Sequence, residues 1–185
     1  MYFDAQKTEQ ALLYIAKQTG NANVSKLVAL KLIFLADRYH LRKYARTITG
    51  DKYVALKLGP VASRTKTLIE QITKNGGTKT LGAKMYRGHE VLFVRDNAET
   101  LTFDELSQTD KEALDAAIRQ LTLHESLVDF THAFPEWEQR WNSRGSRRSV
   151  EMDFVDFFRA APESVEYCDF PQERVELSKK VFLDE

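Results

Sequence analysis

Residues 31–61 read KLIFLADRYHLRKYARTITGDKYVALKLGPV, and this stretch decides the fold of the chain. Residues 32–36 are wholly apolar and end at an acid, Asp37, inside a long helix that we predict over residues 24–44. Apolar side chains cover most of the circumference of this helix, as is typical of a helix at the centre of a core. Because its charged residues come late, we expect its C-terminal end to emerge at the surface.

Turn signals follow this helix. Gly50 marks a first turn, and residues 53–58 favour a short strand or an irregular extended segment. Gly59 and Pro60 predict a loop, because proline lacks an amide proton and pushes the residue before it out of the helical region. We expect the chain to become helical again over residues 61–73.

The rest of the chain predicts one β-hairpin and several shorter helices. The strands of the hairpin are residues 79–86 and 89–94, which are joined by a tight turn. Thr109 and Glu112 have the spacing of a capping box, which predicts the start of a helix. The other helices that we expect are one capped by Asp4 and closed by Gly20, then residues 110–121, 123–133, a short helix with Trp137 and Trp141 on one side, and residues 151–161.

These elements predict a mainly α fold, in which a compact helical domain surrounds the long central helix and one small β-hairpin is a minor β element. We expect this domain to cover residues 1–150, with residues 151–185 forming a C-terminal helix and an acidic tail packed on the same domain. From residue 151 onward, ten acids stand against four bases. Such a tail binds a basic partner, mimics nucleic acid, or simply keeps the protein soluble.

Composition narrows the class of protein. The 27 basic and 27 acidic residues cancel, whereas a dedicated nucleic-acid binder carries a strong positive excess. The single cysteine, Cys168, cannot form an internal disulfide, which favours a reducing cytoplasm, and its acidic neighbours make it a poor nucleophile. No apolar run approaches the ~20 residues of a membrane helix, and the start lacks the pattern of a secretory signal. We therefore expect a cytoplasmic protein that binds neither membrane nor nucleic acid.

The order of the core helix, the Gly50 turn and the GPV sequence at residues 59–61 resembles the Panacea domain, the antitoxin domain of the SocA-like family. A second, looser match is Leu127, then TH at residues 131–132 and PEW at residues 135–137. The resemblance covers residues 10–141 and implies a prokaryotic or phage antitoxin of a toxin-antitoxin system, which neutralises its cognate toxin by direct protein contact. Because one relative delivers its toxin to a protease, the resemblance also offers a proteolytic adaptor as an alternative.

Positive charge collects between residues 38 and 66, where eight Lys and Arg residues stand against one acid. Such a surface steers an acidic partner toward the protein. The plainer interpretation is a solvated helix end and loop. The partner-binding residues that we predict are Arg38, His40, Arg42, Lys43, Lys52, Tyr53, Lys57 and Arg64. We expect reversal of the charge of Arg38 or Lys57 to abolish neutralisation without unfolding the domain. A second copy of the chain is a further candidate partner.

The motif residues have structural interpretations. Asp37 ends the apolar run, so its carboxylate is placed to accept amide hydrogens from the Gly50 or the Gly59 loop. His132 is expected to donate a buried hydrogen bond near Trp137, and both tryptophans are expected to anchor the core. The motif residues that we assign to structure are Asp37, Gly50, Gly59, Pro60, His132 and Trp137.

Catalysis is the rival class of function. Asp37 and His40 lie three residues apart, on one face of the helix, but no positioned nucleophile accompanies them. The sequence also lacks a phosphate-binding glycine loop, which an enzyme that uses the basic patch to act on a small molecule or nucleotide would need. The four histidines show no i,i+4 pair of the kind that binds zinc. We predict no catalytic residue, no metal, no cofactor and no enzymatic activity.

Overall fold

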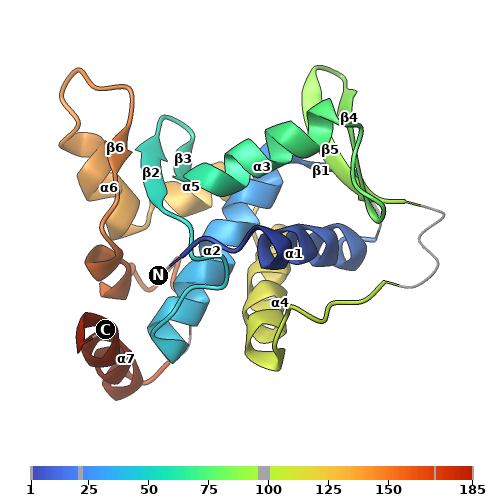
Figure 1. Cartoon of the computed structure of the whole chain (residues 1–185). Helices are drawn as coiled ribbons and strands as arrows, with labels where there is room; N and C mark the ends of the chain where they lie inside the picture. The colour runs from blue at the N-terminus through green and yellow to red at the C-terminus, as the bar shows by residue number, and fades with distance from the viewer. Residues whose placement is uncertain (1, 21–22, 96–100, 169, 185) are drawn as a thin grey trace.

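The computed structural model describes residues 2–20, 23–95, 101–168 and 170–184, and its elements surround one buried helix (Figure 1). This helix is α2 (Lys26–Tyr44), in which every residue from 29 to 42 is buried. Ser25 caps it by accepting a hydrogen bond from the amide of Val28. The predictions of a mainly α fold and of a central helix are confirmed. The helices that pack on α2 first along the chain are α1 (Ala5–Gln18), capped by Asp4 as predicted, and α3 (Ser63–Lys74).

Two small antiparallel sheets flank α2 rather than one hairpin. The predicted hairpin is present as β4 (Leu81–Tyr86) and β5 (His89–Val94), and β1 (Val24–Ser25) adds a third strand beside β5. The second sheet has the order β3-β2-β6, with β2 (Tyr53–Leu56), β3 (Gly59–Ala62) and β6 (Val150–Glu151). The prediction of a single hairpin was therefore incomplete.

The loop predicted at Gly59 and Pro60 is wrong, because both residues lie in strand β3. Pro60 pairs opposite Ala55, and Gly59 pairs opposite Leu56. The strand β3 lies at the edge of its sheet, where a proline without an amide proton is tolerated. The turn of this hairpin is formed by the two residues before Gly59.

The helices after the first sheet are α4 (Gln108–Leu123), α5 (Leu127–His132) and α6 (Pro135–Asn142). The capping box of α4 is formed by Ser107 and Asp110, so its assignment to Thr109 and Glu112 was wrong by two residues. The side chain of Ser107 accepts a hydrogen bond from the amide of Asp110, and the carboxylate of Asp110 accepts one from the amide of Ser107. Trp137 and Trp141 share one side of α6, as predicted, with stacked rings 5.9 Å apart.

The C-terminal segment folds differently from the prediction of a helix over residues 151–161. Its start pairs with β2 as strand β6, and a short 3-10 helix, η1 (Phe154–Phe158), follows. The rings of Phe154 and Phe157 pack against Tyr53, which draws this part of the chain onto the second sheet.

The longer helix comes later, as α7 (Gln172–Asp184), and packs on α2 and η1 at one end of the molecule (Figure 1). Two of the ten acids that the sequence places in this tail, Asp169 and Glu185, lie outside the described residues. In the part of the chain that the structure describes, no helix is both long and apolar enough to cross a membrane.

Candidate protein interface

Asp37 fixes the loop that follows α2. Its buried carboxylate accepts hydrogen bonds from the amides of Ile48 (2.7 Å) and Thr49 (3.1 Å) and from the hydroxyl of Thr49 (2.5 Å). The hydroxyl of Tyr53 donates a fourth, at 2.7 Å. Burial raises the pKa of Asp37 to about 6, and these four donated hydrogen bonds oppose that rise. The prediction that Asp37 holds the Gly50 loop to the helix is thereby confirmed.

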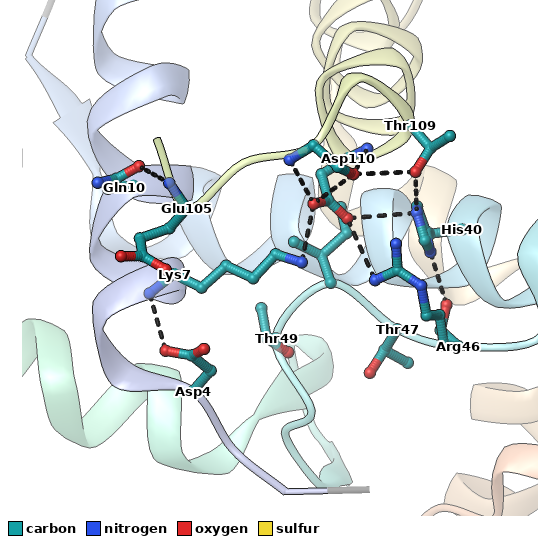
Figure 2. Close-up of polar contacts among 12 residues, drawn as sticks. Asp4, Lys7, Gln10, His40, Arg46, Thr47, Thr49, Glu105, Thr109 and Asp110 are labelled. Carbon is teal, nitrogen blue, oxygen red and sulfur yellow. Dashed lines mark hydrogen bonds and ion pairs between the residues drawn. The ribbon is translucent and has the colours of Figure 1, made fainter. Parts of the chain in front are cut away.

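His40 belongs to a second buried network, which joins α1, α2 and α4 (Figure 2). Its Nδ1 lies 2.7 Å from the carbonyl oxygen of Arg46, which can only accept, so Nδ1 carries the proton. Its Nε2 then accepts from the hydroxyl of Thr109, at 3.0 Å. Burial lowers the pKa of His40 to about 4, so the ring is neutral at pH 7. The charge of the neighbouring Asp110 is balanced by Lys7, at 2.8 Å, rather than by His40.

Arg38 and Arg42 lie one turn apart on α2 and bind the C-terminal segment. Arg38 pairs with Glu136 of α6 at 2.7 Å and with Glu166 at 3.0 Å, and its side chain is completely buried. Arg42 donates to the carbonyl oxygen of Arg159 at 2.8 Å, an oxygen that Arg38 also contacts at 3.2 Å. Two guanidinium groups thus cross-link α2 to segments far along the chain.

The same region buries Cys168, whose sulfur lies 3.7 Å from the guanidinium of Arg38. Burial raises the pKa of this thiol to about 12, which keeps it protonated and unreactive at neutral pH. The prediction that Cys168 is a poor nucleophile agrees with this environment.

Burial divides the predicted partner-binding residues into two groups. Four of them have almost no exposed surface and cannot contact a partner while the domain is folded: they are Arg38, His40, Arg42 and Tyr53. The expectation that the charged end of the central helix reaches the surface was therefore wrong. Sequence alone could not correct it, because the hydrogen-bond partners of these side chains lie 6 to 130 residues away along the chain.

The other four predicted residues remain accessible. Lys52 has 78% of its side chain exposed, and Lys57 and Arg64 are also exposed. We call these three residues the basic face; they lie on the β2–β3 hairpin and at the start of α3. Lys43 is half-buried and pairs with Glu112, which also accepts hydrogen bonds from Tyr39 and Tyr44. Burial raises the pKa of Glu112, but these hydrogen bonds outweigh it and lower the pKa to about 2.

Two charged residues that hold the basic face in place were missed by the sequence analysis. Lys31 is completely buried, and its Nζ donates to the carbonyl oxygen of Pro60 at 2.9 Å. Gly59 has a φ of +98°, which residues with a side chain rarely adopt, and a Cβ there would also lie 2.6 Å from this Nζ, so glycine is favoured at this position. Asp51 accepts hydrogen bonds from the amides of Arg64 (3.0 Å) and Thr65 (2.6 Å) and so caps α3 from a distance. The sequence did contain a signal for the burial of Lys31, namely a charged residue directly before the apolar residues 32–36.

A stacked pair of aromatic rings, His132 and Trp137, also supports the β2–β3 hairpin. The ring of His132 lies parallel to that of Trp137, with centroids 3.9 Å apart. The hydrogen bond is made by Trp137, whose Nε1 donates to the carbonyl oxygen of Leu56 at 3.0 Å. The expectation that His132 donates a buried hydrogen bond was wrong, because its buried Nε2 has no hydrogen-bond partner among the described residues. Trp137 is buried, as expected of a core anchor.

Asp37 and His40, the two residues that the sequence offered for catalysis, lie in separate hydrogen-bond networks. Asp37 and His40 direct their hydrogen bonds to different partners, namely Thr49 and Tyr53 for one and Arg46 and Thr109 for the other. Among the described residues, no group of three or more His, Cys, Asp and Glu side chains is placed to hold a metal ion. What the arrangement provides is a set of exposed bases, the basic face, on and beside a hairpin that Lys31 and Trp137 hold by hydrogen bonds. One member of the set, Lys52, lies 3.8 Å from Glu151.

A family model described as "Antitoxin SocA-like, Panacea domain" matches residues 29–138 of the chain. The chain belongs to this family. The match contains Asp37, Asp51 and Trp137, so the Panacea domain includes the residues that fix the β2–β3 hairpin. Glu166 and Arg159, which bind the buried arginines of α2, lie beyond it. No curated protein and no solved structure matches the chain.

Proposed function

We propose that this Panacea domain is an antitoxin that neutralises a cognate toxin by binding it directly, and that it does so without catalysing a reaction. The observation that carries the proposal is membership in the antitoxin SocA-like, Panacea-domain family over residues 29–138. Binding in the cytoplasm fits a protein whose one cysteine is buried and chemically quiet.

The rigidity of the basic face supports a binding role. Lys57 lies in the turn of the β2–β3 hairpin, and Lys52 and Arg64 flank that hairpin along the chain. Lys31 and Trp137 donate hydrogen bonds to backbone oxygens on either side of the turn. A surface that is already ordered loses little conformational entropy when a partner binds. The exposed lysines and arginine also favour an acidic surface on the toxin.

The test is co-expression with the product of the reading frame adjacent to this gene. We expect that product to arrest growth when expressed alone, and growth to be restored, with formation of a stable complex, when this chain is present. Lys57→Glu should weaken the purified complex by at least about tenfold, which is the effect of a well-placed interface charge. Lys179→Glu on α7, a helix at the other end of the molecule from the β2–β3 turn that carries Lys57 (Figure 1), is the matched control.

Three results would change the proposal. Growth that is never arrested or never restored would contradict the antitoxin role. Rescue accompanied by disappearance of the toxin, rather than by a stable complex, would assign the chain to the adaptor class. Turnover of a small molecule or nucleotide by the purified protein would contradict the absence of catalysis. Arg38→Glu is unsuitable as a probe of contact, because it would place two buried acids, Glu136 and the new glutamate, side by side.

A further inference from the structure

A groove of about 510 Å³, lined largely by apolar surface, lies beside the β2–β3 turn that carries Lys57. Its walls come from the first turn of α2, from the β2–β3 turn and from the β4–β5 turn, which lie at the same end of the molecule (Figure 1). Leu27 and Leu30 lie one turn apart on α2, with Leu30 buried at 4% exposure. Leu58 and Met85 face them with 52% and 61% of their surfaces exposed. We call this cavity the leucine groove.

The leucine groove is built on fixed backbone. Leu58 lies between the two backbone oxygens that Trp137 and Lys31 bind, those of Leu56 and Pro60. Met85 lies in β4 opposite Glu90 of β5, near the end of a regular hairpin. Exposed apolar side chains gathered in one concave place are unusual on a protein without a partner. Because their backbone is already held in place, binding a partner there costs little conformational entropy.

Charge around the leucine groove is positive. Lys57 stands beside Leu58 in one turn and Arg87 stands beside Gly88 in the other, and neither forms an ion pair with a described residue. Two acids nearby, Glu90 and Glu70, are matched by two bases, since Lys26 pairs with both of them and Lys66 pairs with Glu70. An apolar centre with an uncompensated base on each of its two turns is complementary to apolar side chains that have acids on either side.

We propose that the leucine groove binds a segment of the cognate toxin that presents apolar side chains between acidic ones. This inference rests on the proposed antitoxin function and specifies where the toxin binds and which chemistry is recognised. Leu58 and Met85 provide the apolar contacts at the centre, where hot-spot residues of interfaces concentrate. Lys57 and Arg87 attract the acids and align the segment along the groove.

The alternative occupant is a second copy of this chain. On α7, Leu177 and Val181 are exposed on one side of the helix, with Glu173 and Asp184 at its two ends. This stripe has the same pattern of apolar side chains between acids. However, α7 and the leucine groove lie at opposite ends of the molecule (Figure 1). If α7 of one copy bound the groove of the next, the copies would form open head-to-tail chains rather than a closed dimer. We therefore favour the toxin.

The test measures the dissociation constant of the complex between this chain and the purified product of the adjacent reading frame. That product is prepared as a non-toxic variant. We expect Leu58→Asp and Met85→Asp each to weaken binding by at least about tenfold, and the double variant Lys57→Glu with Arg87→Glu to weaken it and to remove most of its salt dependence. These side chains are exposed, so circular dichroism and the melting temperature should stay unchanged. The matched control is Leu177→Asp, a leucine of 54% exposure on α7, which should bind normally.

The outcomes separate the two claims. A wild-type chain that neither binds the toxin nor protects cells overturns the antitoxin function, and this inference with it. A wild-type chain that protects, together with Leu58→Asp and Met85→Asp variants that bind equally well, overturns the leucine groove alone. Loss of binding in Leu177→Asp, with the groove variants intact, moves the contact to α7. Sedimentation that reveals self-association abolished by both Leu58→Asp and Leu177→Asp assigns the groove to a second copy and also overturns the proposal.

Discussion

Lys31 is a buried base that forms no ion pair with a described residue, and this makes the stability of the fold depend on pH. Burial lowers its pKa to about 7 from 10.5. Between these two values the unfolded chain holds a proton that the folded chain has lost, so stability rises with pH across this window and is flat below it. The slope is at most about 1.4 kcal/mol per pH unit.

We predict that Lys31→Met removes this rise. Urea unfolding of the wild-type chain and of the variant at pH 7, 8 and 9 checks it, because the difference between the two proteins cancels the other titrating groups. The control is Lys7→Met, because Lys7 is paired with the carboxylate of Asp110. This variant should keep the rise of stability with pH. A wild-type stability that is constant over this range would show that the amine stays charged when buried.

Arg38 and Lys57 illustrate what a sequence says about single residues. Both are bases in one positive run, and both were predicted to meet a partner. The structure buries Arg38 completely and leaves Lys57 exposed. The difference lies in Glu136 and Glu166, which reach Arg38 from 98 and 128 residues away. Local patterns identify charge, but they do not reveal a distant counter-charge.

At the scale of elements, the parts that follow from local sequence were predicted and those that need distant pairing were not. The periodicity of α2 and the two strands of the β4–β5 hairpin are contained in their own segments. Strand β6 exists because it pairs with β2, about a hundred residues earlier along the chain, and this pairing displaced the helix that its own residues favoured. The leucine groove was missed for the same reason, because its walls come from three separate turns of the chain.

Helix α3 depends on a cap from outside its own sequence. Its N-cap residue, Ala62, offers no side-chain acceptor, and Asp51 supplies one to the amides of Arg64 and Thr65. We predict that Asp51→Ala lowers the free energy of unfolding by about 1–2 kcal/mol, as loss of a cap does. Hydrogen exchange should accelerate at those two amides in particular. The control is Asp104→Ala, an exposed acid on another loop, and equal effects of the two changes would contradict the capping role.

At the scale of the whole molecule, the C-terminal segment completes the core. The sequence predicted a domain ending at residue 150, and that boundary stays a prediction, but Arg38 and Arg42 find Glu166 and the carbonyl oxygen of Arg159 beyond it. We predict that the free energy of unfolding of a chain ending at residue 150 is lower by at least about 3 kcal/mol, which is the cost of leaving buried charges without partners. A chain ending at residue 171 keeps those contacts and should lose less. Thermal unfolding of the full chain and of the two truncated proteins tests whether stability falls in the order full chain, chain to residue 171, chain to residue 150.

The position of Glu166 has a consequence for synthesis. Ribosomes deliver this chain from its N-terminal end, so the guanidinium of Arg38 is made 128 residues before one of its two carboxylate partners. The nascent chain therefore lacks this partner of the buried Arg38 until residue 166 has been made. A chain that stops before residue 166 leaves the buried Arg38 without that carboxylate, which lowers its stability. We therefore expect proteases to remove chains that lack Glu166 sooner than chains that contain it.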